Sequence, residues 1–340
     1  MRTLTVGAPG EVAWREVPEP DLRDARDALV RPVAVALCDL DHPVITGSAP
    51  IPAPIDLGHE AIAEVVATGA AVSHVRPGDL VVVPFQVSCG TCDRCLRGLT
   101  GSCSGVPEQS MYGFGAFGGD WGGMLSDLQR VPFADHMLVP VPAGVEPAAV
   151  ASAADNMPDG WRTVAPALRA RPGADVLVLG GGARSVGLYA VDAAVALGAG
   201  RVDYYDTDPA RLAIASDLGA NAIDAECPHR ADRAYAVTVD AGASRASVAC
   251  AARSTEPGGT CTSVGVIFEP ATPMPLLEMY MKGVHFHIGR AMARPLIPEL
   301  LGLVAAGRLR PQRVTDAVVA WEDAPGAVLE PHTKLVIARD

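Results

Sequence analysis

Short apolar runs separated by turn residues dominate the first 150 residues of the chain. The runs at 33–37, 61–66 and 80–83 are four to six residues long, which is typical of strands rather than of helices. The segment 77–79, Pro-Gly-Asp, stands directly before the third run and predicts a tight turn. We therefore expect this region to be rich in β-structure.

From about residue 157, the pattern changes to an alternation of strand-like segments and alanine-rich helical segments. The predicted strands are 175–179, 201–205, 234–239 and 260–266, and the predicted helices are 186–197 and 209–218. Such alternation indicates βαβ units and a parallel sheet. A helix from Pro295 to about residue 306 and a closing strand at 334–338 follow.

The composition limits the class of protein. The chain has 340 residues, enough for two or three domains of roughly 100–200 residues each. Hydrophobic residues make up 49% and charged residues 19%, which excludes a disordered chain. The net charge is -12, so a surface for nucleic acid or for an anionic membrane is not expected. Neither lysine, Lys282 or Lys334, stands in a G-x-x-x-x-G-K-[ST] loop, which excludes P-loop nucleotide hydrolysis.

No uncharged apolar run approaches the ~18 residues of a membrane span, and the N-terminus lacks the features of a signal peptide. A cytoplasmic protein is therefore expected, and disulfides are disfavoured in that compartment. Four of the eight cysteines nevertheless lie within the fifteen residues 89–103. In a reducing compartment, such a cluster indicates a bound metal ion rather than disulfides.

These four cysteines, Cys89, Cys92, Cys95 and Cys103, have the spacing C-x2-C-x2-C-x7-C. Four thiolates suit a tetrahedral zinc ion and leave no open coordination position, so we expect a structural zinc. The alternatives are reactive thiols, separately buried cysteines or an iron–sulfur cluster. Against the last, the bacterial ferredoxin spacing is C-x2-C-x2-C-x3-C-P, whereas Ser104 follows the fourth cysteine here.

The segment 175–187 predicts a strand, a glycine turn and a helix that starts near Val186 and Gly187. The phosphates of a dinucleotide bind at such a helix N-terminus, where free N–H groups and the helix dipole favour an anion. Asp206 stands nineteen residues after Gly187. A carboxylate there accepts a hydrogen bond from the ribose 2′-OH and repels a 2′-phosphate, which favours NAD over NADP. The alternative is an ordinary βαβ turn without a cofactor.

This turn departs from the usual G-x-G-x-x-G pattern at one position. Counted from Gly182 to Gly187, Arg184 takes the place of the middle glycine, which normally lets the backbone approach the pyrophosphate. Either Arg184 pairs with the phosphates, or Gly180 and Gly181 provide a longer loop.

Two further segments carry possible metal ligands. Cys38 lies in the segment 37–42, Leu-Cys-Asp-Leu-Asp-His, and His59 lies in the segment 58–60, Gly-His-Glu. Alone, such a cysteine or histidine is more often a buried structural residue. Together with the cysteine cluster, the nucleotide turn and Lys334 in the last strand, however, these pieces occur in a familiar order. The chain resembles the zinc-dependent medium-chain dehydrogenase/reductase family, the alcohol dehydrogenases, over essentially its full length.

The resemblance implies a second, catalytic zinc ion. Its ligands would be Cys38 and His59, with Glu60 beside them, and a third ligand just before the nucleotide domain. There, the segment 154–161 resembles the branch that contains glutathione-independent formaldehyde dehydrogenase, in which an aspartate is the ligand, so the implied third ligand is Asp155. One thiolate and one carboxylate neutralise the dication, and an open position accepts the substrate oxygen.

The implied reaction is hydride transfer between a nicotinamide and an alcohol or carbonyl compound whose oxygen the zinc polarises. By position, Phe85 and Leu40 would line the substrate pocket, and Arg211 would approach the adenosine ribose. For Phe85 the alternative is a plain core aromatic, and for Arg211 a solvated helix residue.

Three positions depart from the family pattern. Leu40 stands where the family has a serine or threonine that relays the substrate proton, and Pro43 stands where many members have a histidine of the outer relay. Asp159 replaces the usual threonine on the nicotinamide side. Because leucine and proline side chains can neither donate nor accept a proton, we expect the proton to leave through His42, Asp159 or water beside Glu60. A shift of the site to an unusual substrate is the alternative.

The resemblance implies an α/β fold with two domains. A GroES-like β-rich catalytic domain is expected at 1–156 and 288–340, and a Rossmann NAD-binding domain with a doubly wound parallel sheet at 157–287. A homodimer or homotetramer is also implied, in which strands near 260–267 and 284–288 extend the sheet between subunits.

The expected cofactors are therefore two zinc ions per chain and NAD, and the expected partner is a small alcohol, aldehyde or ketone. Two alternatives stay open. One is oxidation of an aldehyde in the manner of formaldehyde dehydrogenase. The other is a drifted protein that binds zinc and NAD without turnover, for which Leu40 is the main support.

Overall fold

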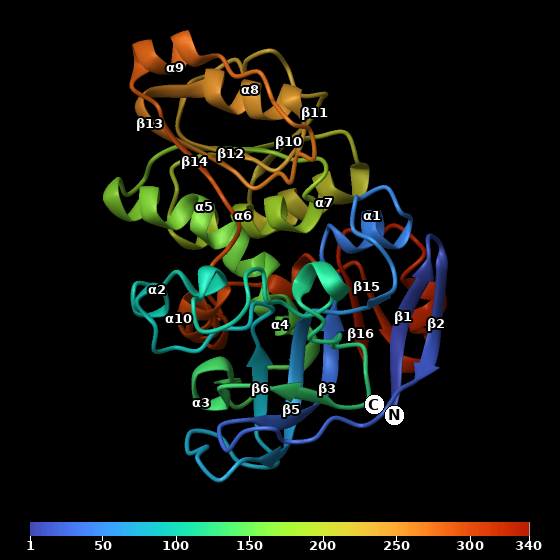
Figure 1. Cartoon of the computed structure of the whole chain (residues 1–340). Coiled ribbons are helices and arrows are strands. Elements are labelled where there is room, and N and C mark those ends of the chain that lie inside the picture. Colours follow the sequence, from blue (N-terminus) through green and yellow to red (C-terminus); the bar gives the residue numbers. More distant parts are fainter. Residues whose placement is uncertain (340) are drawn as a thin grey trace. The chain divides into compact units, whose positions relative to one another are not determined.

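The apolar runs of the sequence become strands in two separate units of the chain (Figure 1). The computed structural model describes residues 1–339. The first unit comprises Met1–Pro158, Ala291–Gly307 and the chain from Thr315 onwards, and the second comprises Asp159–Arg290 and Arg308–Val314. The helix α5 (Asn156–Ala170) begins in the first unit and continues in the second.

The first unit is built on two sheets. The larger sheet has the order β15-β16-β3-β5-β6-β8, with β7 paired to β3, and the smaller sheet has the order β2-β1-β4. The larger sheet contains β3 (Ala28–Ala36), β5 (Glu60–Thr68), β6 (Leu80–Val83), β7 (Gln129–Val131), β8 (Val139–Pro140), β15 (Ala317–Ala320) and β16 (Leu335–Ala338). The smaller sheet contains β1 (Arg2–Ala8), β2 (Glu11–Glu16) and β4 (Ile55–Asp56). The prediction of a β-rich region is confirmed.

Short helices connect these strands. They are α1 (Asp41–Ile45), α2 (Asp93–Leu96), α3 (Ala134–Met137), α4 (Pro147–Val150) and α11 (Ala324–Ala327), together with the longer α10 (Ala293–Ala305). The core of the unit lies on the sheets, where apolar side chains such as Val35, Ala61 and Val83 are fully buried. Burial of this apolar surface is the main favourable contribution to its folding.

The second unit contains one parallel sheet with the strand order β11-β10-β9-β12-β13-β14. Its strands are β9 (Val176–Leu179), β10 (Val202–Asp206), β11 (Asn221–Asp224), β12 (Tyr235–Asp240), β13 (Thr255–Ser263) and β14 (His285–Ile288). Figure 1 shows α6 (Arg184–Ala196) and α7 (Pro209–Leu218) on one face and α8 (Arg245–Ser254) and α9 (Leu276–Lys282) on the other. Every residue of β9 and β12 is buried, as expected for central strands covered on both faces. The predicted doubly wound parallel sheet is confirmed.

Several elements of the second unit differ from the sequence prediction: α8, α9 and β11 were not predicted, and two further differences have a local cause. The strand β13 begins at Thr255 rather than at residue 260, because an irregularity in its pairing with β12 accommodates Gly258 and Gly259. The helix α5 was not predicted because Pro158 and Pro166 interrupt its pattern. The first of these stands in the opening turn, where a helix does not need the missing N–H.

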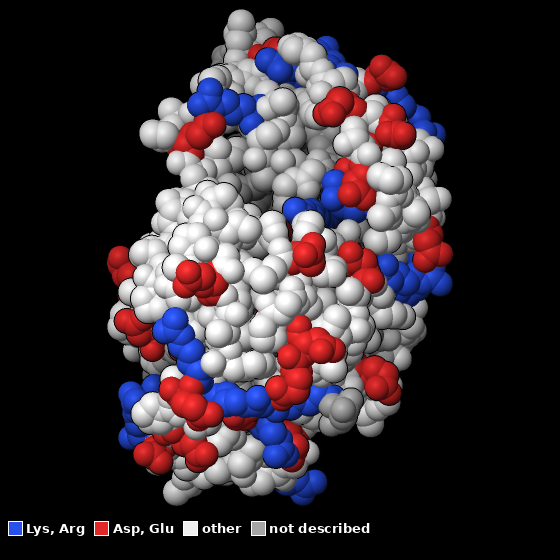
Figure 2. All heavy atoms as spheres, turned by 90° about the vertical axis from the view of Figure 1, so that its right-hand side faces the viewer, with Lys and Arg blue, Asp and Glu red and all other residues white. Residues whose placement is uncertain are grey.

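No helix within residues 1–339 is long and apolar enough to cross a membrane. On the face shown in Figure 2, acidic and basic side chains of the described residues are interspersed rather than gathered into one basic area.

A glycine turn sets the start of β5 and with it the position of His59. Gly58 has φ +90°, and its carbonyl accepts a hydrogen bond of 2.7 Å from the N–H of Met124. A Cβ atom at this position would lie 2.7 Å from the backbone nitrogen of Leu125. Glycine is therefore required here for its conformation and also for its lack of a side chain.

We predict that Gly58→Ala destabilises the protein by about 3 kcal/mol, because the variant adds a clash with backbone to the cost of a positive φ. Gly78→Ala is the matched control, since Gly78 has φ +94° and nothing lies within 4 Å of the position that a Cβ atom would take there. We expect the control variant to lose only about 1 kcal/mol of unfolding free energy. Urea unfolding measures both losses, and equal losses would show that the close approach of Leu125 is unimportant.

Candidate metal centres and nucleotide-binding turn

Four side chains from three separate segments converge in the first unit: Cys38, His59, Glu60 and Asp155. One thiol sulfur, one ring nitrogen and two carboxylate oxygens lie within 4.8 Å of one another. Cys38 follows β3, and His59 and Glu60 stand at the start of β5. The antiparallel pairing of β3 with β5, in which Ala36 faces Glu60, is what makes these two segments meet.

Asp155 arrives from a third segment, directly after a short 3-10 helix at Ala151–Ala154. The N–H of Phe85 donates a hydrogen bond of 3.3 Å to the carbonyl of Ala154, which ties this helix to the chain that leaves β6. Asp155 itself is 9% exposed. The predicted third ligand therefore lies beside the other two.

His59 is the imidazole of this cluster, and it is fully buried. Neither of its ring nitrogens has a hydrogen-bond partner among the described residues. Asp155 Oδ2 lies 3.5 Å from Nε2, and Asp41 Oδ1 lies 3.6 Å from Nδ1. The other oxygen of Asp41 accepts the N–H of Cys38 at 2.8 Å. A buried imidazole with one nitrogen facing an orienting carboxylate and the other facing possible ligands fits a metal-binding histidine.

The charges of the cluster also fit a dication. Burial, followed by the charges of Asp155 and Asp41, raises the pKa of the Cys38 thiol well above its usual value. Burial disfavours a charged His59, but Asp41 and Asp155 outweigh it and raise the pKa of this imidazole to about 9. Burial is the larger cause for Cys38, but in both groups the nearby acids also raise the pKa, and a divalent ion would neutralise that negative charge. A thiolate, an imidazole and a carboxylate are ligands that zinc accepts.

A buried ion pair holds Glu60. The Nζ of Lys334, which is 1% exposed, donates hydrogen bonds of 2.8 Å to Glu60 Oε1 and of 2.7 Å to the carbonyl of Leu37. Burial raises the pKa of Glu60 although the lysine lowers it. Lys334 therefore fixes this carboxylate and the end of β3 in one place.

Aromatic and apolar side chains border the cluster. The rings of Phe85 and Phe114 lie 5.8 Å and 4.9 Å from the ring of His59, centre to centre. Phe85 thus stands beside the candidate site, as the prediction of a pocket residue requires. Leu40 is partly buried against the core of the unit, and its N–H donates to the sulfur of Cys38 at 3.4 Å.

Two predicted proton carriers are not members of this cluster. His42 lies in α1 and is partly exposed. Asp159 lies in α5 and belongs to the second unit, where its carboxylate accepts a hydrogen bond from Arg162. The route of the proton stays a prediction.

The four clustered cysteines also converge, with their sulfur atoms within 4.8 Å of one another. All of them are free thiols. Backbone N–H groups point at the sulfurs, and the distances are 3.4 Å from Cys92 N to Cys89 Sγ and 3.3 Å from Cys89 N to Cys103 Sγ. Such donors stabilise thiolates, so the arrangement fits a closed site for structural zinc.

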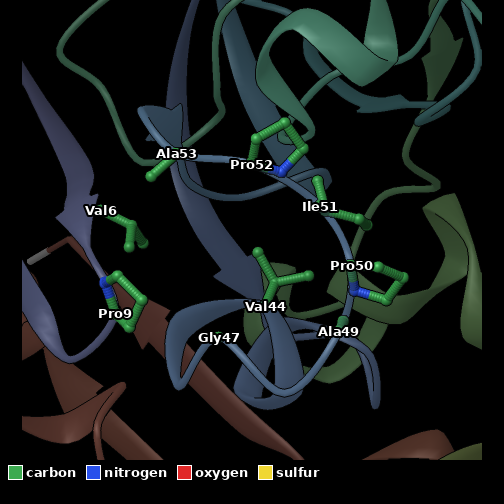
Figure 3. A pocket seen from close by; sticks show the side chains of 9 residues that line it. All are labelled: Val6, Pro9, Val44, Gly47, Ala49, Pro50, Ile51, Pro52 and Ala53. Carbon is green, nitrogen blue, oxygen red and sulfur yellow. The ribbon is translucent and has the colours of Figure 1, made fainter.

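An apolar cavity of about 320 Å³ lies elsewhere in the first unit (Figure 3). Its walls include Val6 of β1, Val44 of α1 and Ile51 of the following loop. None of the residues that line it is a predicted site residue. The cavity is therefore separate from the candidate metal centres.

The predicted nucleotide turn lies between β9 and α6. Gly181 has φ +136°, and a Cβ atom on Gly180 would lie 2.4 Å from Asp206 Oδ2 and 2.5 Å from the hydroxyl of Tyr204. Gly187 is buried in the first half of α6, close to Ala241. The turn leads directly into the N-terminus of α6, at Arg184, which is the position where phosphates bind in such βαβ units.

The structure adds to the interpretation of Asp206. Its carboxylate is 2% exposed and accepts hydrogen bonds from Arg211 at 2.7 Å and 2.8 Å. The hydroxyl of Tyr204 donates to it at 2.7 Å, and the N–H groups of Thr207 and Asp208 donate at 2.8 Å and 3.0 Å. The acid that was predicted to bind the ribose is thus bonded to its own chain, and Arg211 is its main partner.

Sequence reasoning missed two of these neighbours. Phe114 lies in the loop 105–125, which has no periodic pattern that predicts its path. Tyr204 stands two residues before Asp206 on β10, and alternate residues of a strand face the same side. That spacing was a usable signal for a tyrosine beside the acid.

Comparisons with known proteins agree with this description. Residues 24–143 match the family described as alcohol dehydrogenase GroES-like domain, and residues 185–306 match zinc-binding dehydrogenase. A probable zinc-binding alcohol dehydrogenase of Mycobacterium tuberculosis is 32% identical over 316 residues, which cover 91% of this chain and 79% of that protein. Glutathione-independent formaldehyde dehydrogenase of Pseudomonas aeruginosa is 34% identical over 229 residues, or 64% of this chain and 56% of that protein.

A solved structure is similar over its whole length. The alcohol dehydrogenase from Thermus sp. ATN1 has a TM-score of 0.91 and 32% sequence identity, with 100% of both chains covered. Its likeness, the two family matches and the two candidate zinc sites point to one conclusion. The chain belongs to the zinc-dependent medium-chain dehydrogenase/reductase family of alcohol dehydrogenases and is a zinc-binding oxidoreductase of that type.

Proposed function

We propose that this protein transfers a hydride between NAD(H) and an alcohol or carbonyl substrate that binds at a catalytic zinc ion. The convergence of Cys38, His59 and Asp155 carries this proposal, because His59 is fully buried and neither of its ring nitrogens has a hydrogen-bond partner among the described residues. A structural role alone does not account for an unsatisfied imidazole among acids.

The residues of the cluster would have distinct tasks. Cys38, His59 and Asp155 would hold the ion, and Asp41 would orient His59 through Nδ1. When bound, the zinc polarises the oxygen of the substrate and the nicotinamide accepts or donates the hydride. Glu60 would stand beside the ligands, fixed by its ion pair with Lys334.

Side chains near His59 would line the place of the substrate. Phe85 and Phe114 lie next to the imidazole, and Leu40, whose N–H contacts the sulfur of Cys38, would add an aliphatic side chain. An apolar lining excludes water from the reacting atoms and suits a substrate with an apolar body and a single polar oxygen. The cofactor would bind at Gly180–Gly187, and the four clustered cysteines would hold a second zinc for stability.

Oxidation of an aldehyde in the manner of formaldehyde dehydrogenase is the second candidate. Two observations favour it: the 34% identity to that enzyme over 229 residues, and an aspartate, Asp155, at the predicted position of the third ligand. Such a reaction requires a hydrated aldehyde and yields an acid instead of an alcohol. Analysis of the products therefore separates the two candidates.

Zinc analysis and an activity screen test the proposal together. We expect two zinc ions per chain, and NADH formation with at least one member of a panel of primary and secondary alcohols and aldehydes. Cys38→Ser should lose at least about 100-fold in activity, since a ligand of the catalytic ion is altered. Cys95→Ser should lose one zinc and unfold at least about 5 °C earlier, since a structural ligand is altered.

Cys227→Ser serves as the control, because Cys227 belongs to neither cluster. Two zinc ions without NADH formation from any substrate would contradict the proposal and favour a binding protein without turnover. Full zinc content and stability in Cys95→Ser would contradict the structural zinc.

The proton must leave by an unusual route, because Leu40 and Pro43 cannot relay it. We propose His42, Asp159 or water beside Glu60 as the carrier. The pH dependence of kcat should therefore change in one of the variants His42→Ala, Asp159→Asn and Glu60→Gln, with the loss of one ionisation from the profile. Three profiles identical to that of the unaltered enzyme would exclude all of these routes.

We also propose that the protein forms a homodimer or homotetramer through the edge of its parallel sheet. β14 is an edge strand, and Ile288 on it is 68% exposed. On the neighbouring α9, Leu277 is 74% exposed and Tyr280 is 81% exposed. An edge strand beside exposed apolar side chains is a surface that a second copy can cover.

Ile288→Glu should shift the molar mass measured by light scattering from that of an oligomer towards that of the 35.1 kDa chain. Val318→Glu is the matched control, because Val318 is 58% exposed on β15, which is an edge strand of the other large sheet. An unaltered protein that already has the mass of one chain would contradict the proposal. So would an equal shift in both variants.

A further inference from the structure

The carboxyl end of β10 carries a closed group of three side chains in the second unit: Tyr204, Asp206 and Arg211. The hydroxyl of Tyr204 donates to Asp206 Oδ2 at 2.7 Å. Arg211 donates through Nε to Oδ2 at 2.8 Å and through Nη2 to Oδ1 at 2.7 Å. Two backbone N–H groups complete the shell of Oδ1.

Five donors thus occupy one carboxylate, which has about four lone-pair directions. Burial opposes ionisation of Asp206, but the hydrogen bonds from Arg211 and Tyr204 outweigh it and lower the pKa of this carboxyl. An incoming ribose hydroxyl finds no vacant acceptor. It can bind to Asp206 only if one of the present donors leaves.

The donors differ in their freedom to leave. Tyr204 is 0% exposed, and its ring lies under the nucleotide turn, since a Cβ atom on Gly180 would be 2.7 Å from its Cζ. Arg211 comes from α7, its side chain is 13% exposed, and Asp208 Oδ2 already lies 3.3 Å from its Nη1. The side chain of Arg211 can therefore move towards solvent and pair with Asp208 instead, whereas the buried side chain of Tyr204 can do neither.

We propose that Tyr204 is a positioning residue for cofactor selection, which holds the carboxylate of Asp206 in place when the ribose of NAD displaces Arg211. With Arg211 moved towards Asp208, the charge of Asp206 is no longer compensated locally. It then accepts the ribose 2′-OH and repels a 2′-phosphate. Tyr204 keeps this carboxylate ionised and aimed at the ribose during the exchange. This role rests on the proposed use of NAD.

The chain contains a second group of the same kind, which offers a matched control. The hydroxyl of Tyr235 donates to Asp203 Oδ2 at 2.7 Å, and Arg201 Nε donates to Asp203 Oδ1 at 2.7 Å. Tyr235 is 1% exposed. Because Asp203 stands next to Tyr204 on β10, it faces the opposite side of the sheet from Asp206.

The test measures the dissociation constants of NAD and of NADP for the zinc-loaded protein by calorimetry, without substrate. We expect the unaltered protein to prefer NAD. Tyr204→Phe should weaken the binding of NAD by about fivefold to tenfold, the worth of one ordinary hydrogen bond, while the binding of NADP changes less. The preference for NAD then shrinks by a similar factor. Tyr204→Phe and Tyr235→Phe should lower the unfolding temperature to a similar extent. Tyr235→Phe, however, should leave the preference for NAD over NADP unchanged.

The outcomes separate this role from the proposed function. If the unaltered protein binds neither dinucleotide, the proposed function fails and this role fails with it. If the protein binds NAD but Tyr204→Phe keeps the full preference, only this role is overturned. A preference that Tyr235→Phe reduces equally would also overturn it, as would an unaltered protein that binds NADP as tightly as NAD.

Discussion

Compensation of buried charge is the constraint on which the first unit depends. Cys38, Asp41, Glu60 and Asp155 surround the buried imidazole of His59, and Lys334 is a cation that the fold supplies to Glu60. Burying acids without a compensating positive charge is costly. In the absence of a metal ion, burial raises the pKa values of Cys38 and Glu60. A dication removes this cost, so binding of the metal and stability of the unit are linked.

Close contacts also fix the backbone around the cluster. Gly58 adopts a positive φ against Leu125, and Lys334 joins the last strand to the end of β3. Such fixed surroundings keep the ligand atoms close together without the ion. In the second unit the positive partner is local in the sequence, since Arg211 stands five residues after Asp206.

How far the sequence predicts this protein depends on whether the relevant contacts are local. The structural site was predictable from the residues, because short spacings bring Cys89, Cys92 and Cys95 together whatever the rest of the fold does. The catalytic cluster was predictable only through family resemblance. No local pattern around Cys38 or Asp155 indicates that these two distant segments meet in the fold. The strands and the doubly wound sheet were predictable from the hydrophobic periodicity. The helix α5 was not, because its prolines interrupt that periodicity.

The hydrogen-bond state of a predicted residue is harder to foresee than its position. Asp206 was found from its distance to the glycine turn, but its saturation depends on the side chains of Tyr204 and Arg211. The contact between Tyr204 and Gly180 has a consequence for how this sequence can change over time. Any side chain at 180 would collide with the tyrosine, so the two positions are not free to vary independently. The same Cβ atom would lie even closer to Asp206 Oδ2, at 2.4 Å, so a lineage that replaces Gly180 must give up the present arrangement of both the tyrosine and the acid.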